Sequence, residues 1–495
     1  MDAEPLTVTS KGAVRGFRRG ATAVYLGIPF AEAPVGPLRF AAPVALEPWE
    51  GVRDATAYGA TAQRGDAGIT LIPEPSVPGD ATLNVNVFAP VGATPDAALP
   101  VLVWIHGGGY TSGSPASRWY DGDAFARDGV ITVVVSYRIG FDGFGLIEGA
   151  PRNRGLRDQI AALEWVRDEI GAFGGDASRV TVAGQSAGGG SVLALMASPA
   201  ASGLFHRAMA ISPAIGAVSL DAAGHFADRM ATLAGVAADR DGFASVSEER
   251  LVALQKEAAK PERGRALASL NVLLEGGMPL GPVVDGDVLP RHPLDALVDG
   301  ASAAVPLVIG ATDDEVTALT ARYRSVLRFV PVPLALAVLG LGRSRRRAYL
   351  ARTPRKGAAA VLGGFATDRV FRATVLRVAR ARDAAGSTRR TASRTWLYRF
   401  AWASPVPSIG VAGHCLDVPF WFDHLDAEGV TAITGGAPPT DLAAQMHRAM
   451  VAFVRDGDPS WPQWDAATRR GRVFGGAASS PPVETDAYAE VTPLV

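Results

Sequence analysis

The stretch Arg179-Val180-Thr181-Val182-Ala183-Gly184-Gln185-Ser186-Ala187-Gly188 decides the fold of this 495-residue chain. Its first half is a short apolar run, which is typical of a strand covered on both faces of a parallel sheet. Its second half matches the pattern G-x-S-x-G, and small residues at helical spacing follow from Ser191 to Ala197. Glycines flank a serine in this way where a strand turns sharply into a helix and larger side chains would clash. The pattern therefore predicts that Ser186 is a nucleophile at a strand-to-helix turn.

Similar apolar runs recur along the chain and alternate with helical patterns. The runs cover residues 101–105, 131–135, 208–211 and 305–309. Apolar residues also recur near helical spacing over residues 156–173, and Gly174-Gly175 ends that pattern. Strand, helix and strand in this order predict parallel crossover connections. The expected fold class is therefore α/β, with a mostly parallel central sheet covered by helices.

Two long stretches, residues 220–303 and 318–394, have mainly helical patterns. We expect both to be helical insertions between sheet strands, where such folds usually build their substrate pockets. No internal repeat and no long Gly/Ser or Pro linker divides the sequence. Residues 1–495 are therefore predicted to form a single domain.

Composition excludes several classes of protein. Hydrophobic residues make up 48% and charged residues 20% of the chain, which suits a large buried core. Basic and acidic residues number 48 and 49, so no net charge directs the protein to nucleic acid or to an anionic membrane. One basic run is interpreted as a solvated surface turn; it contains Arg343, Arg345, Arg346 and Arg347.

The single cysteine, Cys415, cannot form an intramolecular disulfide, and the N-terminal residues show no secretory signal pattern. Both features favour a reducing, cytoplasmic location. The most apolar stretch, residues 326–342, contains Arg328, Pro331 and Pro333 and falls short of the ~20 apolar residues of a bilayer span. We expect a buried or lid-like segment there, not a membrane span.

A glycine run, His106-Gly107-Gly108-Gly109-Tyr110, directly follows the apolar run at 101–105. Acyl transfer creates an oxyanion, which is stabilised by preorganised N–H donors, and glycines let bare backbone amides approach it. A phosphate-binding loop is the rival interpretation. Neither G-x-G-x-x-G nor G-x-x-x-x-G-K-[ST] is completed here, which argues against that rival.

A nucleophilic serine needs a base and an orienting acid, which follow it in the order acid and then histidine in this kind of fold. His414 lies in a loop after the strand-like residues 396–400, whereas His447 lies in a helical pattern and His292 between prolines. For the acid, Asp313, Asp314 and Glu315 all follow the apolar run at 305–309, at the end of a strand. The residues alone leave that choice open; we expect Asp313 or Asp314 to cap the next helix.

Taken together, these motifs resemble the type-B carboxylesterase/lipase family of the α/β-hydrolase fold, and within it the bacterial para-nitrobenzyl esterases. The likeness runs nearly from end to end. Further segments that carry it are Gly27-Ile28-Pro29-Phe30-Ala31, Pro37-Leu38-Arg39-Phe40, Asn153-Arg154-Gly155-Leu156-Arg157-Asp158-Gln159, Phe173-Gly174-Gly175-Asp176, Asp417-Val418-Pro419-Phe420 and Gly457-Asp458-Pro459.

The resemblance implies roles that the residues alone leave open. It implies a catalytic triad of Ser186, Glu315 and His414. It places the oxyanion donors at Gly108, Gly109 and Ala187. No metal or organic cofactor is implied.

The resemblance also implies two structural ion pairs, Arg39 with Asp80 and Arg138 with Asp158.

The sequence departs from the family pattern at three points. Thr82 stands where secreted relatives have a disulfide cysteine, and Gln185 stands where a glutamate often precedes the serine. Between Gly59 and Val87 there is no aromatic residue, although cholinesterases place a choline-stacking tryptophan in that region. A cholinesterase is therefore disfavoured.

The function implied is that of a serine carboxylesterase, which hydrolyses small-molecule esters through an acyl-enzyme. An amidase or carbamate hydrolase with the same triad is the main alternative within enzymes. A lipase with residues 326–342 as a lipid-facing lid is another. A non-catalytic binding homologue is disfavoured because all three triad residues are present.

Overall fold

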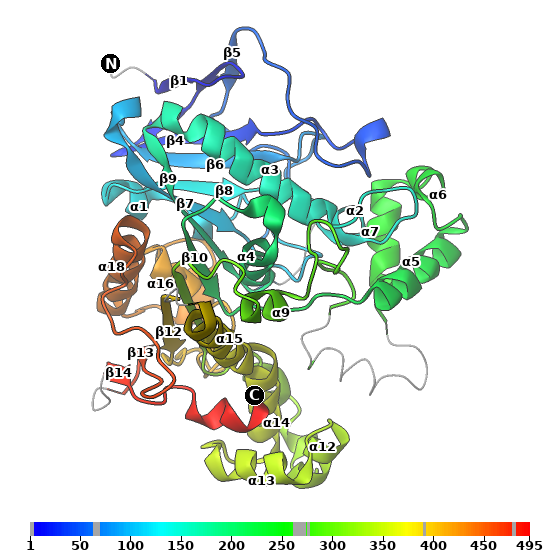
Figure 1. Cartoon of the computed structure of the whole chain (residues 1–495), viewed down its shortest axis with the longest axis vertical. Helices are drawn as coiled ribbons and strands as arrows, with labels where there is room; N and C mark the ends of the chain where they lie inside the picture. The colour runs from blue at the N-terminus through cyan, green and yellow to red at the C-terminus, as the bar shows by residue number, and fades with distance from the viewer. Residues whose placement is uncertain (1–3, 63–69, 261–273, 275–277, 390–392, 478–481) are drawn as a thin grey trace.

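The computed structural model describes residues 4–62, 70–260, 274, 278–389, 393–477 and 482–495 (Figure 1). Its centre is an eleven-stranded sheet in the order β14-β13-β12-β11-β10-β9-β7-β8-β6-β4-β3, and β1, β2 and β5 form a small separate sheet. The strands of the large sheet are β3 (Phe17–Arg19), β4 (Thr22–Pro29), β6 (Asn84–Pro90), β7 (Leu99–Ile105), β8 (Ile131–Val135), β9 (Gly175–Gln185), β10 (Arg207–Ile211), β11 (Leu307–Thr312), β12 (Thr395–Phe400), β13 (Gly471–Phe474) and β14 (Val483–Glu484). Those of the small sheet are β1 (Leu6–Val8), β2 (Ala13–Arg15) and β5 (Val52–Asp54).

The middle of the sheet is parallel, as the apolar runs predicted. Strands β8, β7, β9, β10, β11, β12 and β13 pair in parallel, whereas β6, β4, β3 and β14 pair antiparallel at the two edges. The runs at 101–105, 131–135, 179–183 and 208–211 lie within strands of this sheet, whereas the run at 305–309 overlaps β11, which begins at Leu307. The α/β-hydrolase fold class is thereby confirmed.

The strand β7 shows how both faces of the sheet are covered. Val101, Val103 and Ile105 belong to one buried cluster, together with residues of α3 and α4. Leu102 and Trp104 belong to a second cluster, together with residues of α18. Successive side chains of a strand point to opposite faces, so an unbroken apolar run supplies two cores at once.

The helices outside the two insertions connect and cover these strands. The predicted helix over 156–173 is confirmed as α3 followed by the short turn η4 (Ile170–Phe173), and Gly174 ends it with φ 88°. The helices are α1 (Asp123–Arg127), α2 (Gly140–Phe144), α3 (Arg154–Glu169), α4 (Ala187–Ala197), α16 (Val418–Trp421), α17 (Val430–Thr434) and α18 (Thr440–Asp456).

The two predicted insertions are helical where the structure describes them. In Figure 1, α5 to α7 form a group at one side of the sheet, and α12 to α14 lie at the end of the long axis opposite β1. The first insertion holds α5 (Leu220–Ala234), α6 (Arg240–Ala244), α7 (Glu248–Ala258) and α9 (Pro293–Val298). The second holds α10 (Thr317–Ala321), α11 (Arg324–Leu327), α12 (Val332–Val338), α13 (Arg343–Arg352), α14 (Ala358–Thr367) and α15 (Ala373–Arg389), with the π-helical η6 (Asp368–Arg372) between the last two. A single domain stays a prediction, which is supported by a sheet built from both ends of the chain.

Residues 326–342 are only partly buried. Leu336 and Leu341 are buried, whereas Val326, Phe329 and Leu334 are exposed, so the expectation of a buried segment is correct for one face alone. Among the residues described, no helix combines the length and apolar character needed to cross a bilayer. The nearby arginine run is on the surface, but it begins the helix α13, so the expectation of a turn was wrong.

One of the two expected ion pairs forms. Arg138 pairs with Asp158 at 2.6 Å with both side chains buried, which confirms that prediction. The pair between Arg39 and Asp80 was wrong, because Arg39 binds Asp142 of α2 at 2.8 Å. The sharp α2 turn brings Asp142 beside Arg39, while Asp80 lies exposed.

Candidate active site

Ser186 occupies a strained turn between β9 and α4. Its backbone has φ 58° and ψ −119°, a conformation that residues other than glycine rarely adopt. The flanking glycines are required by crowding. A Cβ at Gly184 would lie 2.8 Å from the carbonyl oxygen of Ile105, and one at Gly188 would overlap that same oxygen. The turn therefore presents Ser186 at the carboxyl end of β9, at the edge where the other candidate residues lie.

Glu315 and His414 come together at this edge. Glu315 follows β11, and its buried Oε2 lies 2.5 Å from Nδ1 of His414. Its Oε1 accepts a hydrogen bond from the Thr312 N–H at 2.8 Å, and its carbonyl oxygen accepts one from the His414 N–H at 3.0 Å. The carboxylate is thus held at both oxygens and favours a proton on Nδ1, so that Nε2 is the acceptor whenever the imidazole is neutral.

Burial lowers the pKa of His414, but the neighbouring Cys415 and the Glu315 carboxylate raise it, and the net pKa lies well above the ordinary histidine value. Nε2 of His414 is 3.2 Å from the Gln185 side-chain amide nitrogen, which also lies 3.2 Å from Sγ of Cys415. Within the described residues no hydrogen bond joins His414 to Ser186. In this state the Gln185 amide therefore lies where it can donate to Nε2, the atom through which a histidine base would take a proton.

A cavity of about 250 Å³ joins the candidate residues. Ser186, His414, Gly108 and Gly109 line it, and Leu71 and Ile72 supply apolar wall. Such a cavity has room for a small ester, with a serine, an imidazole and apolar side chains in its lining.

The glycine loop leaves backbone donors free beside this cavity. Gly108 and Gly109 have φ of 111° and 61°, and Ala187 is the first residue of α4. Within the described part of the chain, the N–H groups of these three residues donate to no protein acceptor. Free N–H groups at a helix start and on a glycine turn are suited to a developing negative charge.

Asp313 and Asp314 do not cap the next helix, so that expectation was wrong. No side chain caps α10. Asp313 instead binds Arg399 at 2.8 Å, and Asp314 binds Arg355 at 3.1 Å. Partly buried arginines from β12 and from the second insertion compete for these carboxylates, and charged hydrogen bonds are stronger than those to a helix end.

Three residues at the site were missed by the sequence analysis. Glu74 lines the cavity, accepts a hydrogen bond from Ser112 Oγ at 3.3 Å, and has a pKa raised by burial. Phe371 packs its ring 4.9 Å from that of His414. Asp417 lies buried near Glu315 and His414, and burial and then the Glu315 charge raise its pKa to about 7. The position of Glu74 between Pro73 and Pro75 was the one available signal, because it predicts a loop.

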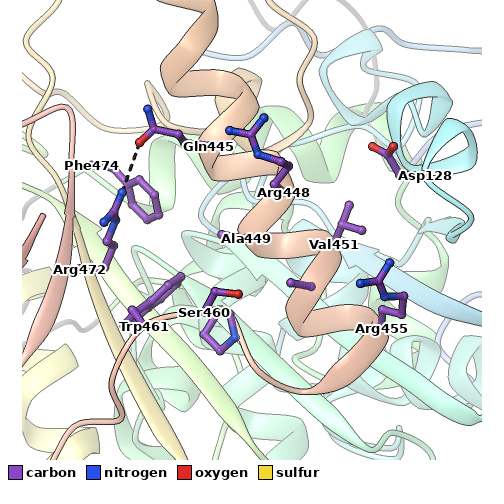
Figure 2. A pocket seen from close by; sticks show the side chains of 12 residues that line it. Asp128, Gln445, Arg448, Ala449, Val451, Arg455, Ser460, Trp461, Arg472 and Phe474 are labelled. Carbon is purple, nitrogen blue, oxygen red and sulfur yellow. Dashed lines mark hydrogen bonds between the residues drawn. The ribbon is translucent and has the colours of Figure 1, made fainter.

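A larger cavity of about 560 Å³ lies elsewhere, against α18 (Figure 2). Arg448 and Arg455 of α18 line it with Trp461 and Arg472, and Arg472 donates to Gln445 at 3.2 Å. None of the candidate catalytic residues reaches it. The chemistry of the lining residues, and not the volume, therefore favours the smaller cavity as the candidate active site.

A serine at a strained strand-to-helix turn, at the carboxyl edge of a mostly parallel sheet, defines the class of α/β-hydrolases. Residues 3–330 match the model of the carboxylesterase family. The chain belongs to the carboxylesterase family, and it is a serine carboxylesterase that hydrolyses carboxylic ester bonds.

Relatives of known name agree with this assignment over the whole chain. The chain is 33% identical to the para-nitrobenzyl esterase of Bacillus subtilis, with 94% of this chain and 93% of that protein covered. It is 32% identical to the phenmedipham hydrolase of Pseudarthrobacter oxydans, with 94% of each covered. Among solved structures, a carboxylesterase of Geobacillus stearothermophilus superposes with a TM-score of 0.82 at 34% identity, over 99% of each chain.

Proposed function

We propose that Ser186 is the nucleophile of this esterase, that His414 is its general base, and that Glu315 orients the base and stabilises its protonated form. The observation that carries the proposal is the Glu315–His414 hydrogen bond beside Ser186 in one cavity. A carboxylate on Nδ1 fixes the tautomer in which Nε2 can accept the serine proton, and it stabilises the imidazolium that results.

The reaction then follows in two halves. Ser186 Oγ attacks the ester carbonyl carbon as His414 Nε2 takes its proton, and the tetrahedral intermediate expels the alcohol, which receives that proton. Water repeats the sequence on the acyl-enzyme and releases the acid. Before the attack, Nε2 must exchange the Gln185 amide for Ser186 Oγ, because Gln185 holds that position in the free enzyme.

The free N–H groups of Gly108, Gly109 and Ala187 are proposed to bind the oxyanion. Each is a preorganised donor that needs no rearrangement, and each such donor contributes about 10²–10³ in rate. The cavity of about 250 Å³ and its apolar wall at Leu71 and Ile72 favour esters with small, uncharged groups over long acyl chains.

Covalent labelling tests the nucleophile directly. A fluorophosphonate probe is expected to add to wild type at Ser186, and Ser186→Ala is expected to abolish the adduct. Ser198→Ala is the matched control, because Ser198 lies at the other end of α4 and its Oγ makes no hydrogen bond within the described residues. A folded wild type that never labels would support a binding role instead.

A substrate panel tests the ester assignment. Short nitrophenyl esters are expected to turn over faster than long-chain nitrophenyl esters, matching anilides and aryl carbamates. Faster anilide or carbamate hydrolysis would favour the amidase or carbamate alternative, and faster long-chain hydrolysis would favour a lipase.

A further inference from the structure

The segment that follows Glu315 has an unusual charge. Between Glu315 and Asp368 there is no acidic residue, although the chain as a whole has 48 basic and 49 acidic residues. We call residues 316–357, which comprise α10 to α13, the basic segment. Its ten basic residues are Arg322, Arg324, Arg328, Arg343, Arg345, Arg346, Arg347, Arg352, Arg355 and Lys356.

The same segment exposes large apolar side chains. Six of the sixteen such side chains exposed in the described chain lie between residues 319 and 338, and Phe329 is 74% exposed. They are Leu319, Tyr323, Val326, Phe329, Leu334 and Val338. Single exposed apolar side chains are ordinary, but a concentration of them on one part of a surface marks an interaction site.

The exposure is not a sign of poor packing. The inner face of the basic segment buries Leu336, Leu341 and Tyr349 against Val361 and Phe365 of α14, in a cluster of its own. Leu334 and Val338 lie four residues apart on α12, so they share the outer face of that helix, away from buried Leu336. The segment is thus amphipathic, with an anchored face and a free apolar face.

The positive charge on the outer face is not neutralised by the protein. Within the described residues, no acidic side chain pairs with Arg322, Arg324, Arg328, Arg343, Arg345 or Arg347. The Arg328 guanidinium lies 4.5 Å from the centre of the Phe329 ring, so charge and apolar surface adjoin. In Figure 1, α12 and α13 lie at one end of the long axis, where a flat partner can reach them.

We propose that the basic segment docks this esterase on the surface of a bilayer that contains anionic lipids. Exposed aliphatic and aromatic side chains gain by entering the boundary of the acyl region, and arginines beside them gain from anionic headgroups. A nucleic acid would match the charge but would leave Val326, Leu334 and Val338 without an apolar partner. The proposal concerns binding, so it does not depend on the catalytic roles given above.

Vesicle co-sedimentation of the full-length protein tests the proposal. Wild type is expected to sediment with phosphatidylglycerol/phosphatidylcholine vesicles, to bind phosphatidylcholine vesicles at least ten-fold more weakly, and to be released by added salt. The triple variant Val326→Ser/Phe329→Ser/Leu334→Ser and the triple variant Arg343→Gln/Arg345→Gln/Arg347→Gln are each expected to lose at least ten-fold in binding.

Matched controls change the same chemistry elsewhere. Leu6→Ser/Val8→Ser/Val52→Ser removes exposed apolar side chains of the small sheet, and Arg152→Gln/Arg167→Gln/Arg455→Gln removes three exposed charges. Both controls are expected to bind vesicles like wild type, and all variants are expected to hydrolyse a soluble nitrophenyl acetate normally. The proposal is overturned if wild type ignores anionic vesicles, if the controls lose binding equally, or if the apolar triple variant only converts a dimer into a monomer.

Discussion

The turn around Ser186 follows β9 and the basic segment follows β11, yet the two regions are stabilised in opposite ways. Around Ser186, the atoms are so crowded that a single added Cβ at Gly188 meets a backbone carbonyl. In the basic segment, Phe329 and Leu334 project into solvent, and six arginines have no acidic partner among the residues described. Crowding and strain position one reacting atom at the turn, whereas the segment offers a broad surface.

The crowded turn and the exposed segment are thus suited to different tasks, the first to a chemical reaction and the second to contact with a partner. Strained backbone and buried charge occur where a reaction needs fixed geometry. A concentration of exposed apolar side chains is typical of a surface that meets another surface. Substitutions at the turn should therefore change catalysis, whereas substitutions on the exposed face of the segment should leave catalysis unchanged.

Replacing the proposed nucleophile, Ser186, should produce the largest effect. Ser186→Ala is expected to lower kcat by about 10⁴- to 10⁶-fold, because the acyl-enzyme route is lost while binding and oxyanion donors remain. Alanine removes only the hydroxyl, so the melting temperature should stay close to that of wild type or rise slightly. A loss of less than ten-fold in steady-state hydrolysis would remove Ser186 from the mechanism.

Replacing Glu315, the proposed orienting acid, should produce the second-largest effect. Glu315→Gln is expected to lower kcat by about 10⁴-fold, since an amide no longer fixes the tautomer of His414 or stabilises its charge. Asp314→Asn is the matched control at the adjacent position, where the carboxylate binds Arg355. The control should lose stability but keep kcat within a few-fold of wild type. Equal losses of kcat in both variants would contradict the assignment of Glu315.

The crowded turn can be tested through stability. Gly188→Ala is expected to destabilise the protein by about 1–3 kcal/mol and to lower activity, because the new Cβ displaces the Ile105 carbonyl. Gly171→Ala is the control, since its added Cβ meets nothing within 4 Å. Denaturant unfolding measures the change in the free energy of unfolding, and kcat/KM measures the loss of activity. A turn that accepts alanine at both positions would not be crowded.

The pH profile tests the residue before the nucleophile. The pKa of His414 is raised, so activity should fall with decreasing pH already above the ordinary histidine range. Gln185→Glu places a carboxylate near Nε2, favours the protonated base further, and should move the acidic limb of kcat/KM upward by about one pH unit. The higher pKa means that the base is inactive up to a higher pH. A limb that stays in place would show that Gln185 does not face the base during turnover.

The smallest effect is expected in the basic segment. Phe329→Ser should change hydrolysis of a soluble short ester by less than two-fold and stability by less than about 0.5 kcal/mol, because the side chain is mostly in water. Leu336→Ser is the contrasting variant. Leu336 lies within α12 and is fully buried, so a serine there should destabilise the protein strongly. If Phe329→Ser and Leu336→Ser lowered stability to a similar extent, the segment would have no free apolar face.

The sequence by itself determined the strands, the turn at Ser186 and the chemistry of the family. Apolar runs identified the strands because burial on both faces leaves no polar alternative along the run. The glycines around Ser186 identified the turn because no other residue fits beside Ile105. Both are local requirements, so a few adjacent residues are enough to predict them.

Only the tertiary structure decided which distant groups meet. Asp142 is the partner of Arg39 where Asp80 was expected, and Asp313 and Asp314 bind arginines where a helix cap was expected. Glu74 and Phe371 reach the site from segments with no motif. The free face of the basic segment also depends on the fold, because residues 326–342 are apolar apart from Arg328 and only packing against α14 determines which of the apolar side chains are buried. Contacts between residues far apart in the chain depend on how whole elements pack, and no short stretch of sequence contains that information.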